Sequence, residues 1–113
     1  MGIQIFGSAK SFNTKKAERY FKERRIPYQL VNLEKQGISK GELRSVRAVV
    51  GSYESMTDFE GREDAALLRY LSSEEAKLEK LFENPRWLKT PIVRSGKEAA
   101  VGYCPEVWKS WEG

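Results

Sequence analysis

The stretch IQIFGSAKSFNTKKAERYFKERRIPYQLVNL, residues 3–33, decides the fold. It starts with a short β-prone run that Gly7 ends, and it finishes with a second β-prone run at 28–33. Between the two runs, Ala17, Tyr20 and Phe21 lie on one face of a predicted helix. A strand, a helix and a strand in about 30 residues form a βαβ unit, so the two strands are expected to be parallel with a right-handed crossover.

The middle of the chain is predicted to be helical. Residues 39–42 and 72–75 each have the Ser-x-x-Glu pattern of a capping box, and each precedes apolar residues at helical spacing. Residues 52–61 show no clear period and predict a loop, and residues 62–71 predict another helix. In the βαβ unit, the helix between the two strands is expected to begin at Asn13 or Thr14 as its N-cap.

The end of the chain predicts an antiparallel hairpin followed by a helix. Residues 90–96 and 98–103 are two short strands around a tight turn, and Pro105 suits the first turn of a helix. The whole order is β-α-β, helices, then β-β-α. This order predicts an α/β fold, a mixed four-stranded sheet with helices on both faces, in a single domain over residues 1–113.

Composition excludes several kinds of chemistry. The chain of 113 residues has one cysteine, Cys104, and no histidine, so it has no intramolecular disulfide, no Ser-His or Cys-His pair and no imidazole metal ligand. Carboxylates look scattered, so no metal site is expected. No apolar run approaches the length of a membrane span and the N-terminus lacks a secretory signal pattern, so the expectation is a cytoplasmic protein.

Charge is distributed unevenly along the chain. Residues 1–50 carry 11 Lys and Arg against 4 Asp and Glu, a net charge of +7, while residues 51–113 carry 9 against 12, a net charge of −3. The basic half suggests an acidic partner, which could be a protein surface, a nucleic acid or a small anion. The alternative is a merely solvated surface. Nucleic-acid binding is not expected, because no recognition helix or aromatic-basic platform is evident.

Four stretches together resemble one known family. They are ENPRWLKTPIV at 83–93, IPYQLVNL at 26–33, SKGEL at 39–43 and VGYCPEVW at 101–108. In order and spacing they are similar to the glutaredoxin-dependent arsenate reductase (ArsC) family, which includes the Spx-like transcription regulators. The resemblance implies a thioredoxin-like (glutaredoxin-like) fold with a helical insertion at about residues 39–84.

The same resemblance implies that the reactive thiols are absent. Active family members carry a nucleophilic cysteine before the first helix, often with a second cysteine three residues on, and Ser11 and Thr14 stand at those positions here. A thiolate is the nucleophile in such chemistry, whereas a serine hydroxyl has a far higher pKa and needs a neighbouring base. Lys10 or Lys15 is expected to be exposed and protonated, so we expect Ser11 to serve as a cap or hydrogen-bonding group.

The anion-binding positions of the family also differ. Where active arsenate reductases have an arginine before the proline, this chain has Thr90, and where a third arginine precedes the last helix it has Cys104. Phe59 and Glu60 align with the position of another basic residue, with Arg62 nearby. Arsenate reduction is therefore disfavoured.

Two residues keep alternatives open. Pro91 matches the family's cis-proline, so the backbone of Thr90 could pair with an extended peptide or with glutathione, or the proline could simply shape the entry of the strand. Cys104 could be a reactive thiol whose pKa is lowered by a helix N-terminus, or a small, inert filler of the core.

Two functions from different classes follow. The first is a non-catalytic family member, a pseudoenzyme that acts as a binding or regulatory module whose basic half faces an acidic protein; in the Spx-like branch that partner is RNA polymerase. The alternative is a thiol- or glutathione-dependent oxidoreductase that uses Cys104 or Ser11. No cofactor other than glutathione is expected. The predicted binding residues are Lys10, Ser11, Thr14, Thr90, Pro91 and Cys104.

Overall fold

The computed structural model describes residues 2–60 and 63–111. Its elements, in chain order, are β1 (Ile3–Gly7), α1 (Phe12–Glu23), β2 (Tyr28–Asn32), α2 (Leu33–Gln36), α3 (Lys40–Val50), the 3₁₀ helices η1 (Glu54–Met56) and η2 (Glu63–Tyr70), α4 (Glu74–Glu83), the 3₁₀ helix η3 (Pro85–Trp87), β3 (Ile92–Ser95), β4 (Glu98–Val101) and α5 (Pro105–Ser110). Within these residues no helix is both long and apolar enough to cross a membrane.

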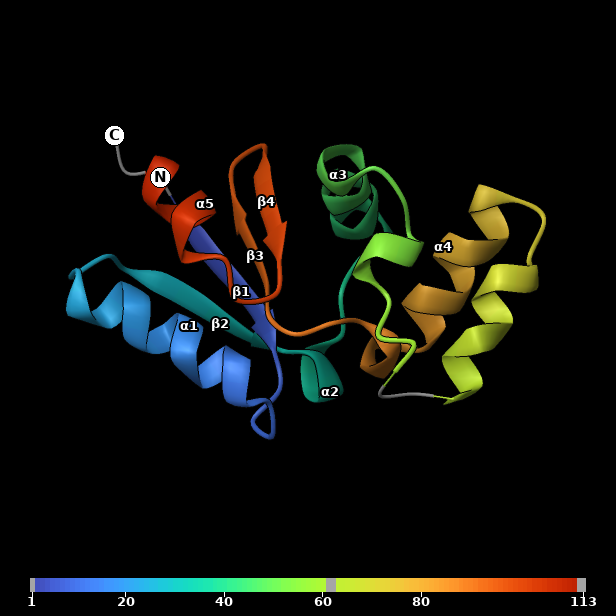
Figure 1. Ribbon diagram of the computed structural model, residues 1–113, viewed down its shortest axis with the longest axis horizontal. Helices are drawn as coiled ribbons and strands as arrows, with labels where there is room; N and C mark the ends of the chain where they lie inside the picture. The colour runs from blue at the N-terminus through green and yellow to red at the C-terminus, as the bar shows by residue number, and fades with distance from the viewer. Residues whose placement is uncertain (1, 61–62, 112–113) are drawn as a thin grey trace.

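The four strands form one mixed sheet in the order β2-β1-β3-β4. β1 runs parallel to β2, as the βαβ pattern predicts, and antiparallel to β3, which pairs with β4 in an antiparallel hairpin. The predicted fold class is confirmed. β1 and β3 occupy the centre of the sheet, so the loop that follows β1 and the segment that precedes β3 meet at the same end of the sheet (Figure 1).

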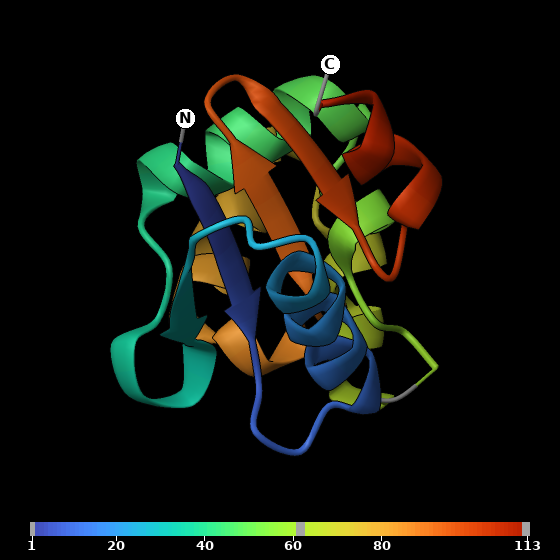
Figure 2. The same cartoon turned by 90° about the vertical axis from the view of Figure 1, so that its left-hand side faces the viewer.

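Helices cover both faces of this sheet. α1 and α5 lie on one face, and the helices of the insertion lie on the other (Figure 2). Side chains of β1 alternate accordingly: Ile3 and Ile5 pack with Trp108 of α5, whereas Phe6 packs in the second apolar cluster with Leu43 of α3. The sheet thus separates two hydrophobic clusters.

The first helix begins earlier than the sequence suggested. Ser11, not Asn13 or Thr14, is the N-cap of α1: its backbone is extended and its side chain accepts a hydrogen bond from the Thr14 backbone N–H. A second boundary also moves. β2 ends at Asn32, whose side chain caps the short helix α2 through the Glu34 N–H, so the strand does not continue to residue 33.

The insertion is helical but less regular than predicted. The capping box at 39–42 is present, whereas residues 72–75 do not form one: Ser73 is the N-cap of α4, which puts Ala76 rather than a glutamate at the third helical position. The predicted loop at 52–61 contains η1. Of the predicted helix at 62–71, residues 63–71 are described, and Glu63–Tyr70 form a 3₁₀ helix that ends before Leu71.

Ion pairs join the two longer helices of the insertion. Three of them run between α3 and α4: Lys40 with Glu79 at 2.6 Å, Arg44 with Glu75 at 3.6 Å, and Arg47 with Glu74 at 2.7 Å. The basic residues sit at successive turns of α3, and their acidic partners follow α4 in reverse order, as antiparallel helices require. Part of the basic first half of the chain is therefore neutralised by the acidic second half.

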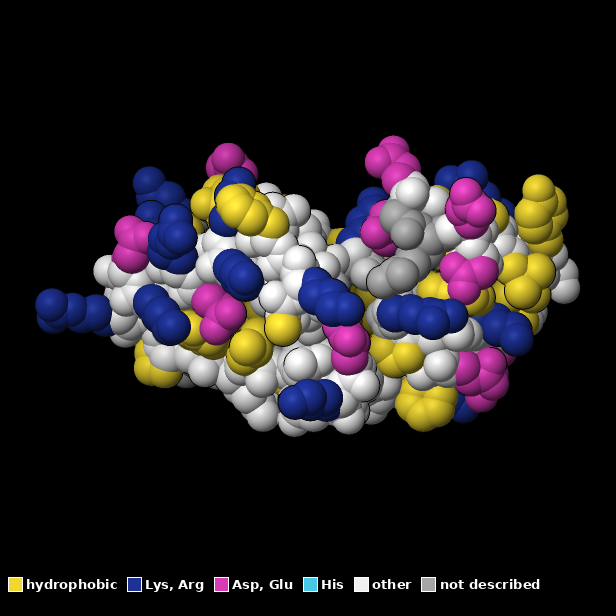
Figure 3. All heavy atoms as spheres, turned by 90° about the horizontal axis from the view of Figure 1, so that it is seen from below, with side chains coloured by type: hydrophobic (Ala, Val, Ile, Leu, Met, Phe, Trp, Pro, Cys, Tyr) yellow, Lys and Arg dark blue, Asp and Glu magenta, His cyan; other side chains and the backbone are white. Residues whose placement is uncertain are grey.

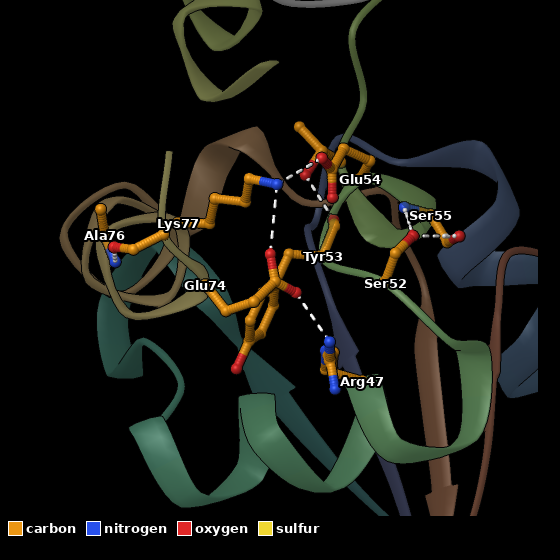
Figure 4. A network of polar contacts seen from close by, with 10 residues as sticks. Arg47, Ser52, Tyr53, Glu54, Ser55, Glu74, Ala76 and Lys77 are labelled. Atoms are coloured by element: carbon orange, nitrogen blue, oxygen red, sulfur yellow. Dashed lines mark hydrogen bonds and ion pairs between the residues drawn. The ribbon is translucent and has the colours of Figure 1, made fainter. Parts of the chain in front are cut away.

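One lysine links this pairing to η1 (Figure 4). The Lys77 ammonium lies 2.8 Å from Glu54 and 3.1 Å from Glu74, and Glu74 also contacts Arg47. The hydrogen bond from Lys77 holds the pKa of Glu54 below its ordinary value. The network fixes the start of α4 against the end of α3.

Candidate functional site

The loop between β1 and α1 is a tight, hydrogen-bonded turn. The Ser11 N–H donates to the Ser8 carbonyl at 3.0 Å, and the Lys10 N–H donates to the Ser8 hydroxyl oxygen at 3.2 Å. The Ser8 hydroxyl in turn donates to Glu34 at 2.8 Å. Because the Ser11 side-chain oxygen accepts the Thr14 N–H at 3.2 Å, this hydroxyl already serves the helix end.

Three of the predicted site residues face one cleft. Its volume is about 430 Å³, and Lys10, Ser11 and Thr90 all line it. The Thr90–Pro91 peptide bond is cis, and Pro91 is buried, with its carbonyl accepting the Gly102 N–H at 2.7 Å. The structure therefore places the α1 cap and the segment before β3 together, as the family resemblance implies.

Apart from Lys10, sequence reasoning did not single out the charged residues of this cleft. Its lining also includes Glu34, Asp58 and Arg86, so cations and carboxylates share the same space. Arg86 reaches Asp64 at 3.3 Å, with both side chains more than half exposed. The sequence did offer a clue to Arg86, because this residue follows Pro85 inside the stretch 83–93 that resembles the family. No pattern in the sequence around Asp58 indicates that this residue lines the cleft.

Thr14 has a different environment from Ser11. It is 2% exposed, and its hydroxyl accepts the Ser8 N–H at 3.4 Å. A Cβ atom at Gly7 would lie 2.4 Å from its Cγ2 atom, so the Thr14 side chain fills the space over the glycine at the end of β1. Thr14 packs beneath the loop and lines a separate, smaller cleft of about 210 Å³ with Leu30.

Cys104 is held in a way that disfavours thiolate formation. Its Sγ–H donates to the Val101 carbonyl at 3.3 Å, and the residue is half-buried against the Trp108 cluster. Burial, and then the charge of Glu106, raise the pKa of this thiol above its ordinary value. Of the two alternatives for Cys104, the direction of this pKa favours the inert filler over the reactive thiol, because α5 has only six residues and Cys104 makes no side-chain cap.

The family's other anion-binding positions do not supply cations to the cleft. Phe59 is partly buried against the insertion core, with the Arg69 guanidinium 3.9 Å from its ring centroid, and Glu60 is exposed. Arg62 lies outside the described residues. Over residues 2–60 and 63–111, no group of three or more Cys, Asp or Glu side chains is placed to hold a metal ion.

The exposed face of α1 carries basic residues that the ion pairs among the described residues do not use. Lys15, Arg19 and Lys22 are exposed, and none of them takes part in an ion pair with another described residue. Figure 3 shows Lys and Arg side chains spread along the face of the molecule that includes α1, with Asp and Glu between them. Part of the surface open to an acidic partner thus lies on α1.

Comparison with known proteins gives one curated relative and several similar folds. The global transcriptional regulator Spx 2 of Oceanobacillus iheyensis is 32% identical over 108 residues, covering 91% of this chain and 78% of the relative. A putative ArsC family related protein from Bacteroides fragilis superposes with a TM-score of 0.83 at 18% identity, covering 97% of both chains. The arsenate reductase of Vibrio cholerae gives 0.82 at 20% identity, over 96% of this chain and 97% of the other. No protein-family profile matches.

Proposed function

Because this chain belongs to the ArsC/Spx family of thioredoxin-like proteins, we propose that it is a non-catalytic member that binds and regulates a protein partner. The observation that carries the proposal is the state of the two candidate nucleophiles. Ser11 accepts the Thr14 N–H as a helix cap, and the one thiol, Cys104, is half-buried and has a raised pKa.

The chemistry of the cleft supports the same reading. Thiol exchange and arsenate reduction both start from a thiolate, which attacks sulfur or arsenic. A hydroxyl in place of that thiolate needs a general base, and the chain has no histidine to provide one. The cleft therefore retains the shape of a redox site and lacks its nucleophile.

The partner is proposed to belong to the transcription machinery. The relative from Oceanobacillus iheyensis is named as a global transcriptional regulator. The basic residues Lys15, Arg19 and Lys22 recur at i, i+4 and i+7 along α1, so they share one exposed face. Such a face suits an acidic patch on a protein, and we propose RNA polymerase as that protein.

The experiment measures the affinity of purified RNA polymerase for the immobilised chain. The variant K15E/R19E is expected to bind about tenfold more weakly than the wild type, because like charges replace complementary ones at the contact. The control K97E/K109E makes the same change of net charge on the exposed β3–β4 turn and on α5, and it is expected to bind as the wild type does. Equal affinity for both variants and the wild type would refute the proposed surface.

The alternative function is an oxidoreductase that holds glutathione along the Thr90 edge and uses Cys104. It requires catalytic turnover that Cys104→Ser abolishes. The binding module requires the opposite result: Cys104→Ser leaves RNA polymerase affinity unchanged, and neither protein turns over a disulfide. The two functions are separated by assaying both activities on the same pair of proteins.

A further inference from the structure

Two exposed aromatic rings lie together beside the proposed partner surface. Phe12, the first residue of α1, is 69% exposed, and Tyr103, just before α5, is 42% exposed. The Lys16 ammonium lies between them, 4.9 Å from the Phe12 ring centroid and 5.4 Å from that of Tyr103. Phe12, Lys16 and Tyr103 therefore form one aromatic-lysine patch, although they come from opposite ends of the chain.

The patch is held from beneath. The Tyr103 ring stands edge-on to Trp108 at 5.4 Å and 85°, and Trp108 is 1% exposed in the core between α1 and α5. Phe12 is fixed at its backbone by the Ser11 cap that precedes it. Leaving a large aromatic side chain in water forgoes the free energy of burial, and preorganised exposed aromatics are typical of binding hot spots.

A groove of about 390 Å³ borders the patch. Phe12 lines it together with Thr90, Gly102 and Lys89. Neither Lys16 nor Lys89 has an ion-pair partner among the residues that the structure describes, whereas Asp58, which also lines the groove, is engaged within the chain. The groove and its rim thus offer two ammonium groups next to two apolar rings.

We propose that this groove and the aromatic-lysine patch bind a segment of the partner protein in which acidic residues flank an aromatic or large aliphatic one. The inference rests on the proposed function and names the chemistry that the partner must present. Carboxylates of the segment pair with Lys16 and Lys89, while its apolar side chain packs against Phe12 and Tyr103. A nucleic acid fits less well, because the Lys16 ammonium lies over the ring faces on which bases would stack.

The test uses a defined peptide and the full chain. The probe is acetyl-Glu-Asp-Phe-Leu-Asp-Glu-amide, titrated by calorimetry and by NMR shifts of the backbone amides. One control peptide has lysine in place of every acidic residue, and another has alanine in place of Phe and Leu. The variants are Phe12→Ala and Lys16→Glu, with Tyr70→Ala as the matched control: Tyr70 is 83% exposed on η2, on the side of the molecule opposite α1 (Figure 1).

We expect the acidic-aromatic probe to bind the wild type and Tyr70→Ala equally, with shifts at Phe12, Lys16 and Tyr103. Phe12→Ala and Lys16→Glu are each expected to weaken binding about tenfold, and both control peptides to bind at least about tenfold more weakly than the probe. Undiminished binding to Phe12→Ala, or no binding of the probe, would overturn the inference.

A single-stranded DNA oligonucleotide added as a competitor tests whether the patch binds nucleic acid instead. If it binds the wild type with a steep salt dependence and shifts the same amides, the patch is a nucleic-acid surface and the inference fails. The RNA polymerase affinities of the wild type and of K15E/R19E are measured separately, so a failure of this inference can be distinguished from a failure of the proposed function.

Discussion

The side-chain oxygen of Ser11 accepts the backbone N–H of Thr14 at 3.2 Å, so the two residues at which the family resemblance places thiols are bonded to each other as a helix cap. The cap satisfies one of the free N–H groups at the start of α1. It also sets the direction in which α1 leaves the cleft. The position at which the family resemblance implies a nucleophilic thiol is here a helix cap.

Removing this cap is expected to destabilise the fold. Ser11→Ala leaves the Thr14 N–H without its acceptor and should lower the free energy of unfolding by about 1 kcal/mol. Ser11→Asp keeps an acceptor and adds a negative charge to a first turn that has no acidic residue, so it should be at least as stable as the wild type. Urea unfolding measures both changes. Equal stability of Ser11→Ala and the wild type would contradict the assignment of the cap.

The contact between Gly7 and Thr14 predicts a coupled pair. Gly7→Ala places a methyl group 2.4 Å from the Thr14 Cγ2 atom, and a buried β-branched side chain has little freedom to move away. We expect this change to cost about 1–3 kcal/mol. In the double variant with Thr14→Ala the contacts with Cγ2 and Oγ1 are removed and only the Cβ contact at 3.0 Å is left, so its cost in thermal or urea unfolding should be less than the sum of the single costs. Strict additivity would show that the two sites do not touch.

Cys104 is expected to be a slow thiol. Its raised pKa means that a smaller fraction is thiolate at neutral pH, so it should react with iodoacetamide more slowly than a free cysteine peptide, and its rate should rise at a higher pH. The matched comparison is the variant S11C/C104A, in which the thiol stands at the N-terminus of the 12-residue helix α1 and its pKa should be lowered. Faster alkylation of Cys104 than of this variant would contradict the placement.

The network around Lys77 predicts an acid-sensitive contribution to stability. The pKa of Glu54 is lower in the folded chain than its ordinary value of 4.5, so its contribution is complete above that pH and is lost as the pH falls through the folded value. Glu54→Gln should therefore cost about 0.5 kcal/mol at pH 7, given the partial exposure of the pair, and progressively less as the pH falls through the folded-state pKa. Urea unfolding over this pH range measures the difference, and a cost that persists undiminished in acid would contradict the ion pair.

Local patterns in the sequence predict two of the three strand pairings, β1 with β2 and β3 with β4, because strand and helix periods and turn residues are encoded within short windows. The helical pattern places the N-cap at Asn13 or Thr14, which are also good N-cap residues, whereas the family resemblance implies a cap or hydrogen-bonding group at Ser11, and the backbone conformation decides for Ser11. Contacts between side chains that are distant in the sequence were not predictable either. Asp58 reaches the cleft from the insertion, and Arg47 meets Glu74 only because α3 and α4 pack side by side.

The uneven charge distribution along the chain was misleading for the same reason, that contacts between distant residues cannot be predicted from local sequence. Net charge by half of the chain pointed to a broad basic surface, yet the α3 residues Lys40, Arg44 and Arg47 are paired within the molecule. Sequence distance concealed these pairs, because their partners lie in the acidic second half. The structure removes these α3 residues from the candidate partner surface and leaves the basic face of α1 within it.

The central claim, that the cleft binds without redox catalysis, is tested most directly by turnover. Purified chain is incubated with arsenate, glutathione and a glutaredoxin, and oxidised glutathione is followed through NADPH consumption by glutathione reductase. The account predicts the rate of the protein-free blank, both for the wild type and for protein alkylated at Cys104. Turnover well above the blank that Ser11→Ala or Cys104→Ser abolishes would contradict it.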